Sequence, residues 1–169
     1  MAPMPSRVDT AAFRRTVGRF ATGVTVVTTV VDGVAHGMTA NAFSSLSLDP
    51  LLVLVCVDRS AGLHERVTRA GTFAICVLAE GQEALSRRFA ARHPAGAGGQ
   101  FEGVATVPAP VTGSPLLEGG LVYLECRLSA VHPGGDHSIF VGEVLAAGEL
   151  GGTEPLLWFE GGYHRLARD

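Results

Sequence analysis

Apolar side chains recur with two different periods along this chain, and the change between them separates helices from strands. Phe13, Val17 and Phe20 are spaced to share one face of a helix, which Asp9 can cap and which runs to about Arg19. Beyond it the period of a helix stops, and a β-branched run indicates the first strand.

That strand, predicted over residues 24–31, ends at Asp32-Gly33, the strongest hairpin signal in the sequence. The chain returns through residues 34–39, passes a loop of small polar residues, and enters the continuous apolar run from Leu51 to Val57. A run that is apolar on both faces belongs inside a packed sheet or barrel, because a solvated edge would leave one face exposed.

The stretch from Leu121 to Val131 alternates between apolar and polar residues, as a half-buried antiparallel strand does. In it Glu125 and Arg127 are predicted to face away from the apolar side. Other predicted elements are a helix capped by Ser60 and running to about Ala70, a strand Thr72 to Leu78, a helix Gln82 to Ala91, a mobile Gly-rich loop His93 to Gly103, and strands Ser138 to Ala147 and Pro155 to Phe159. Six or seven strands with short helices predict a mainly β fold, a small barrel with antiparallel pairing.

The composition and length of the chain indicate a single globular domain. The 169 residues are 47% hydrophobic and 17% charged, enough for one sizeable core, so we expect a single domain over residues 1–169 with residues 1–8 disordered. The net charge of −3, with 13 Arg and no Lys, argues against a nucleic-acid partner. No apolar segment is long enough to cross a membrane. Three cysteines without metal-ligand spacing favour reduced thiols in a cytoplasmic protein, and no metal site is expected.

The polar loop before the apolar strand is the most informative stretch for function. It places Thr39, Asn41, Ser44, Ser45 and Ser47 among small residues, where backbone N–H groups can approach an anion such as a phosphate. The sequence contains none of the usual hydrolase, kinase or dinucleotide-fold motifs. It therefore favours a protein in which a bound cofactor supplies the chemistry.

Four motifs in this order resemble the short-chain flavin reductases, the small components of two-component flavin-dependent monooxygenases. They are His36-Gly-Met-Thr-Ala-Asn41 with Phe43-Ser-Ser-Leu-Ser47 and Asp49-Pro50, Phe20-Ala-Thr-Gly-Val24 with the strand after it, Gly135-Asp-His137, and Pro155-Leu-Leu-Trp-Phe159 with Gly162-Tyr163. The resemblance covers the chain from about Phe13 to Leu166. It implies an FMN-binding split β-barrel that forms a homodimer and binds FMN or FAD together with NADH or NADPH. The implied function is transfer of a hydride from the nicotinamide to the flavin, which then supplies a partner monooxygenase.

Position by position, the resemblance also implies site residues. His137 would lie on the nicotinamide side and orient that ring. The residues implied to contact flavin are Gly37, Met38, Thr39 and Ala40 along the ring, Asn41, Ser44 and Ser45 at the ribityl chain and phosphate, Cys56, Val57 and Asp58 on the other side of the ring, Ser60, Arg88, Phe89 and Ala90 near the phosphate, and Tyr163 near the ring or the cofactor entrance.

Structural roles compete with several of these assignments. Cys56 and Tyr163 are also suited to packing, Arg88 to a solvated helix face, and His137 to a turn in which it bonds to the nearby backbone. Two other functions remain open from the sequence: a non-catalytic flavin or haem binder on the same barrel, and an oxidase of the pyridoxamine-phosphate type. The second would need more basic phosphate ligands than these few arginines.

Overall fold

A computed structural model describes residues 8–91 and 99–167 of the chain. The predicted disordered N-terminus, apart from Val8, and much of the predicted Gly-rich loop lie outside these ranges. The helices are α1 (Thr10–Val17), α2 (Gly62–Ala70) and α3 (Glu83–Ala90), the last preceded by the 3-10 helix η1 (Glu80–Gln82). The strands are β1 (Thr22–Gly23), β2 (Thr25–Val31), β3 (Val34–Ala40), β4 (Phe43–Leu48), β5 (Leu51–Asp58), β6 (Thr72–Val77), β7 (Thr106–Pro108), β8 (Pro115–Leu117), β9 (Val122–Gly134), β10 (His137–Glu149), β11 (Leu157–Phe159) and β12 (Gly162–His164).

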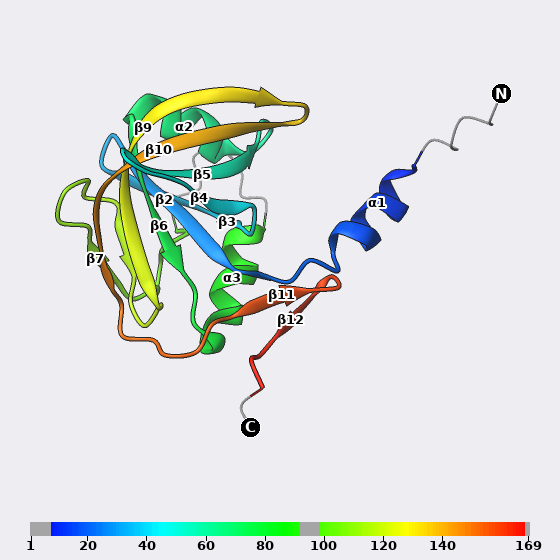
Figure 1. The fold of residues 1–169 in the computed structure, drawn as a ribbon. Coiled ribbons are helices and arrows are strands. Elements are labelled where there is room, and N and C mark those ends of the chain that lie inside the picture. The colour runs from blue at the N-terminus through cyan, green and yellow to red at the C-terminus, as the bar shows by residue number, and fades with distance from the viewer. Residues whose placement is uncertain (1–7, 92–98, 168–169) are drawn as a thin grey trace.

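Seven of these strands form one antiparallel sheet in the order β3-β2-β6-β9-β10-β5-β4, which confirms the mainly β fold with short helices (Figure 1). Two small sheets accompany it, β1-β11-β12 and β7-β8. The β2–β3 hairpin turns at Asp32 and Gly33, whose φ angles of 51° and 76° are those that a two-residue hairpin turn requires. The predicted Asp-Gly turn is therefore confirmed.

The two edge strands of the large sheet, β3 and β4, are consecutive in the chain. Only Asn41 and Ala42 separate them, so the two edges lie close together at this point and the sheet curls around its core. We call this junction the seam. The prediction of a loop after Thr39 was wrong in part, because residues 43–48 pair with β5 as a strand. Phe43 packs against the core from β4, while Ser44 and Ser45 stay exposed at this edge of the sheet.

The core is built from alternate residues of the strands and is covered by α2. On β5, Val53, Val55 and Val57 are buried, whereas Leu54 and Cys56 between them are only partly buried. The expectation that this strand is buried on both faces was thus wrong in one respect. It does lie inside the sheet, between β10 and β4, but only one of its faces meets the core. The other face is available for a ligand or a partner.

Two local predictions also fail for identifiable reasons. Glu125 was expected on the exposed side of its strand but is completely buried, and one of its carboxylate oxygens accepts hydrogen bonds from the backbone N–H groups of Val111 and Thr112. Ser60 does not cap α2, whose N-cap is Ala61. The Ser60 hydroxyl donates instead to the carboxylate of Asp58, at 2.7 Å.

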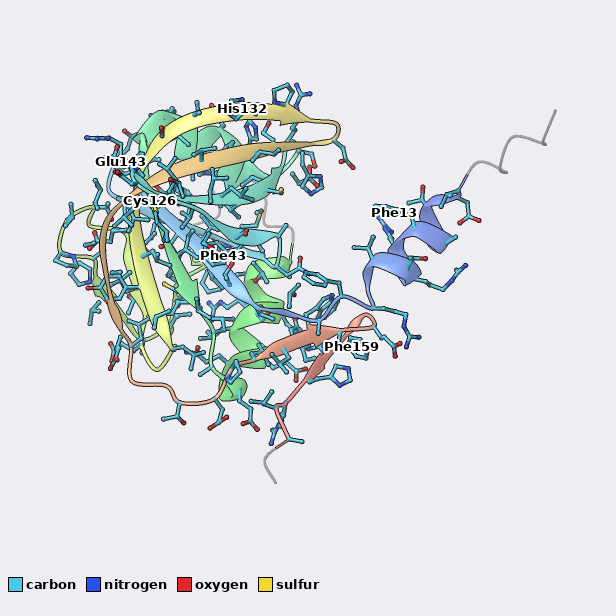
Figure 2. All side chains as sticks on the ribbon, in the orientation of Figure 1. Phe13, Phe43, Cys126, His132, Glu143 and Phe159 are labelled. Atoms are coloured by element: carbon cyan, nitrogen blue, oxygen red, sulfur yellow. The ribbon has the colours of Figure 1, made fainter. Side chains whose placement is uncertain are left out.

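Helix α1 lies apart from the large sheet, next to the β11–β12 turn (Figure 1). Asp9 caps it by accepting a hydrogen bond from the N–H of Ala12 at 2.7 Å, as predicted, although the helix ends at Val17 and not at Arg19. None of its side chains is buried. Figure 2 shows Phe13 on this separate helix, while Phe43 and Cys126 lie within the body of the sheet.

Candidate functional site

A cavity of about 640 Å³ opens at the seam, between the large sheet and α1. Its size falls within the roughly 300–1,000 Å³ typical of small-molecule sites. Most of its lining is apolar, with hydroxyl and amide groups on the β3–β4 side. The lining comprises Phe13, Arg14, Val17, Gly18, Phe20 and Thr22 from the N-terminal segment, Asn41, Ala42, Phe43 and Ser44 at the seam, Leu54 and Cys56 on β5, and Trp158 and Gly161 near the C-terminus.

Three of the residues implied by the sequence, Asn41, Ser44 and Cys56, meet in this cavity. Hydrogen bonds fix the seam, because the backbone carbonyl of Ala42 accepts from the N–H of Cys56 at 3.0 Å. Thr22, also in the lining, has a buried hydroxyl without a hydrogen-bond partner among the described residues. The cavity therefore combines an apolar wall with polar groups that a ligand can use.

The outer face of β5 and β10 leads from this cavity to His137. Ile139 pairs with Cys56, and two residues along the strand His137 pairs with Asp58, so both pairs share one face of the sheet. Two residues of strand span about 7 Å, which places His137 a short distance beyond the cavity wall. A ligand that leaves the cavity along this face reaches the imidazole.

The imidazole of His137 is held by its neighbour. Its Nδ1 lies 2.8 Å from Oδ1 of Asp136, an exposed carboxylate at the β9–β10 turn. This hydrogen bond lowers the pKa of Asp136 below its usual value of 3.8. Asp136 is ionised at any pH above its lowered pKa. The stabilisation that its hydrogen bond with His137 contributes is lost as the pH falls through that lowered pKa. The Asp136 carboxylate is therefore ionised across the neutral pH range, where it can accept a hydrogen bond from Nδ1 of His137.

The predicted residues on β3 are occupied by contacts within the protein. The Thr39 hydroxyl donates to the backbone carbonyl of Ser86 at 2.7 Å, and the Ser86 hydroxyl lies 2.8 Å from that of Tyr163. Tyr163 also packs edge-on against Trp158 and lies under the guanidinium of Arg87, 4.8 Å from the ring centroid. These contacts tie α3, β3 and β12 together behind the cavity wall.

Gly37 is covered by the segment that precedes β7. The Gln100 side chain donates to its carbonyl at 2.7 Å and accepts from its N–H at 3.0 Å, so one amide replaces a neighbouring strand at this edge. A Cβ atom at Gly37 would lie 2.9 Å from the Phe89 ring and 3.1 Å from that of Phe101. Close packing of these rings thus explains a glycine here. Arg88 donates to the carbonyls of Gly99 and Glu102, at 2.9 and 2.7 Å, and holds the same segment.

The other predicted residues occupy varied positions. Val57, Ala40 and Phe89 are buried in the core, Met38 packs against it, and Ala90 is exposed on α3. Ser45 is exposed on β4, where its carbonyl accepts from the Ser44 hydroxyl at 2.9 Å. The structure thus brings Asn41, Ser44 and Cys56 to one cavity and His137 with Asp58 to its extension. The ligand roles implied for all of these residues remain predictions.

Sequence reasoning missed the contribution of α1 and of Trp158 to the cavity. Trp158, the only tryptophan in the chain, packs against the core and also lines the cavity. Arg14 belongs to no motif, and Phe20, although part of a motif, was not expected to contact a ligand. The missing information was tertiary, since only the folded chain places α1 opposite the seam.

We expect Cys56 to be the thiol that reacts in the native protein. Burial raises the pKa of Cys76 to about 11 and that of Cys126 to about 12, so both stay protonated and inert at pH 8. Cys56 is partly exposed in the cavity. Titration with a chromogenic disulfide at pH 8 should label one thiol, and saturating flavin should slow that labelling about tenfold. Labelling of Cys56 at an unchanged rate with flavin bound would place the ligand elsewhere; Cys56→Ser is the control.

No described helix is long and apolar enough to cross a membrane. Among residues 8–91 and 99–167, no three His, Cys, Asp or Glu side chains are grouped so that they could hold a metal ion.

Comparison with known proteins gives consistent results over nearly the whole chain. A family model described as a flavin reductase like domain matches residues 17–167. An NADH-dependent FAD reductase of Streptomyces globisporus is 44% identical over 161 residues, with 95% of this chain and 88% of the relative covered. The reductase component of a 4-hydroxyphenylacetate 3-monooxygenase from Thermus thermophilus is 44% identical over 157 residues, covering 92% and 95% of the two chains. A solved NADH:FAD oxidoreductase of Streptomyces globisporus, in complex with NAD and FAD fragments, is 42% identical over 99% of both chains, with a TM-score of 0.89.

Proposed function

The chain belongs to the flavin reductase like domain family, and from that premise we propose that it is an NADH-dependent flavin oxidoreductase. It takes FMN or FAD as the flavin and supplies it in reduced form to a flavin-dependent monooxygenase. The observation that carries this proposal is the cavity at the seam, where Asn41, Ser44 and Cys56 meet an apolar wall next to the face that bears His137.

The residues of the cavity suit a flavin. An isoalloxazine ring is flat and largely apolar, and Phe20, Leu54 and Trp158 offer it apolar contacts. Asn41 and Ser44 provide an amide and a hydroxyl for the ribityl chain and its phosphate. A flavin held by these residues would supply the acceptor for a hydride from the nicotinamide.

The protein's own residues serve that transfer by position. The apolar wall excludes water from the ring, and the face of β5 and β10 gives the nicotinamide a surface to lie on beside it. His137, oriented by Asp136, is available to hold the carboxamide. No general base is needed for hydride transfer. This fits a cavity in which no carboxylate and no histidine is found among the described lining residues.

Flavin should behave as a substrate that departs after reduction. A departing ligand binds with a Kd of about 1 µM, or about −8 kcal/mol, whereas a permanently held group needs about −12 kcal/mol. Steady-state rates measured against both flavin and NADH should therefore give saturable dependence on each, and dialysis should remove the flavin. Two observations together would contradict this prediction: ping-pong kinetics, and flavin that stays bound through extensive dialysis.

The same proposal includes a homodimer in the cytoplasm. Exposed apolar side chains support the dimer, among them Phe13 and Phe20 of the N-terminal segment, with exposures of 59% and 75%, and Leu48 and Leu51 at the β4–β5 turn. Three free cysteines suit a reducing compartment. Sedimentation equilibrium at micromolar concentration tests the dimer directly.

The function itself is tested by following NADH absorbance with FMN, FAD and riboflavin supplied in turn. Oxidation should depend on the added flavin and saturate with it. Flavin binding without any acceleration of NADH oxidation would instead indicate a non-catalytic binder.

A further inference from the structure

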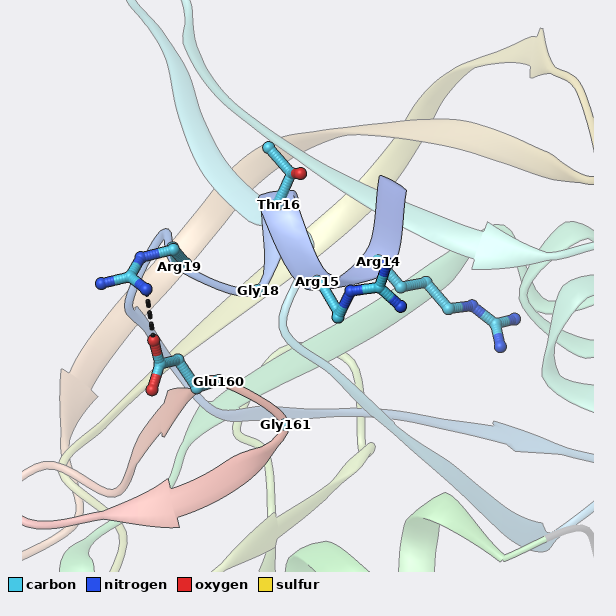
Figure 3. A pocket seen from close by; sticks show the side chains of 7 residues that line it. All are labelled: Arg14, Arg15, Thr16, Gly18, Arg19, Glu160 and Gly161. Carbon is cyan, nitrogen blue, oxygen red and sulfur yellow. Dashed lines mark ion pairs between the residues drawn. The ribbon is translucent and has the colours of Figure 1, made fainter. Parts of the chain in front are cut away.

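A second cavity, of about 560 Å³, lies between α1 and the β11–β12 turn (Figure 3). It is lined by Arg14, Arg15, Thr16, Gly18, Arg19, Glu160 and Gly161. Arg14, Gly18 and Gly161 also line the cavity at the seam, so the two spaces adjoin. Two of the three shared residues are glycines, which have no side chain that could separate the two cavities.

The chemistry of the two cavities is complementary. The first is largely apolar, whereas the second presents three guanidinium groups and one hydroxyl against a single carboxylate. Arg19 is paired with Glu160 at 3.0 Å, and this pair is drawn in Figure 3. The guanidinium groups of Arg14 and Arg15 have no hydrogen-bond or ion-pair partner in the described part of the chain. Two uncompensated positive charges thus line the second cavity, and one of them, Arg14, also lines the first.

Arg88, which the resemblance implies near the phosphate, and its neighbour Arg87 are already engaged in contacts within the protein. Arg88 donates to two backbone carbonyls, and Arg87 forms an ion pair with Glu83 at 2.7 Å while its guanidinium covers the ring of Tyr163. Recruiting either side chain to a phosphate would require these contacts to break. Arg14 and Arg15 need no such change.

We propose that the second cavity binds the diphosphate and adenylate half of a dinucleotide flavin, FAD, whose ring occupies the cavity at the seam. Arg14, common to both cavities, meets the phosphate that FMN and FAD share, and Arg15 meets the phosphate that only FAD carries. This inference rests on the proposed function and deepens it, because it makes FAD the preferred flavin. Arginine suits the role since its fork of N–H donors matches phosphate oxygens.

Binding of FAD, FMN and riboflavin to the wild-type protein and to single arginine variants tests the proposal. The wild type should bind FAD about tenfold more tightly than FMN, the effect of one charge-assisted hydrogen bond. Arg15→Ala should abolish that preference and leave FMN affinity unchanged. Arg14→Ala should weaken FAD and FMN about tenfold each and leave riboflavin unaffected. Because α1 buries no side chain, these variants should fold as the wild type does.

Arg69→Ala is the matched control, since Arg69 is likewise an exposed arginine in the last turn of a helix, α2. It should leave all three affinities unchanged. Equal affinity of the wild type for FAD and FMN overturns the proposal. An Arg15→Ala variant with a higher KM for NADH but normal flavin affinities also overturns it, because the cavity then serves the nicotinamide dinucleotide. If the wild type oxidises NADH with FMN and FAD alike, the proposed function stands and only this inference fails.

Discussion

Replacing His137 with alanine should lower kcat/KM for NADH on the order of 100-fold while leaving flavin affinity unchanged. The imidazole lies beyond the cavity wall, on the face shared with Cys56 and Asp58, and Asp136 fixes its orientation at 2.8 Å. Loss of a group that orients one reactant disturbs the alignment of the two rings, and such misplacement costs about this much. The measurement is the NADH oxidation rate at saturating flavin, together with a flavin titration.

His164→Ala is the control, because His164 is an exposed imidazole on β12 that is not part of this face. It should leave both quantities unchanged. An unaltered rate in His137→Ala would remove His137 from the site. A weaker flavin affinity that accounts for the whole loss of rate would place His137 against the flavin and not against the nicotinamide.

The strand pattern predicted the fold well because most of its signals are local. The Asp32-Gly33 turn, the β-branched run before it and the alternation of β9 each depend on neighbours in the chain. Glu125 shows the limit of such reasoning. Its polarity predicted exposure, but the segment around Val111 folds over it and gives the carboxylate two N–H donors. Nothing local to Glu125 specifies that contact.

For the candidate site, too, the sequence placed some residues correctly and others not. Asn41, Ser44 and Cys56 were identified through the family resemblance and meet in one cavity. Gly37 was also taken from a motif, but the rings of Phe89 and Phe101 cover it. A motif specifies the residue type that a position needs, and a position can need glycine for packing as well as for a ligand.

The contribution of α1 could not be predicted because its arginines look like ordinary solvated charges in the sequence. Amphipathic helices commonly carry arginine on their exposed face. Arg14 and Arg15 gain significance only from the glycines and the β11–β12 turn that the fold brings opposite them. The proposed binding of FAD by two adjoining cavities is therefore a property of the tertiary structure.

Ala42→Trp should abolish most flavin binding, with a loss of affinity on the order of 100-fold. Ala42 is exposed at the seam and lines the cavity, and its backbone is held by the hydrogen bond from Cys56. An indole at this position fills the space that the isoalloxazine ring needs without disturbing the core. Ala147→Trp on β10 is the matched control, since Ala147 is exposed and does not line the cavity.

Calorimetric titration of the wild type, Ala42→Trp and Ala147→Trp with FAD is the most direct test of where the flavin binds. The expected result is a Kd of about 1 µM for the wild type and the control and a roughly 100-fold weaker Kd for Ala42→Trp. Equal affinity in all three proteins would contradict the placement of the flavin in the cavity at the seam.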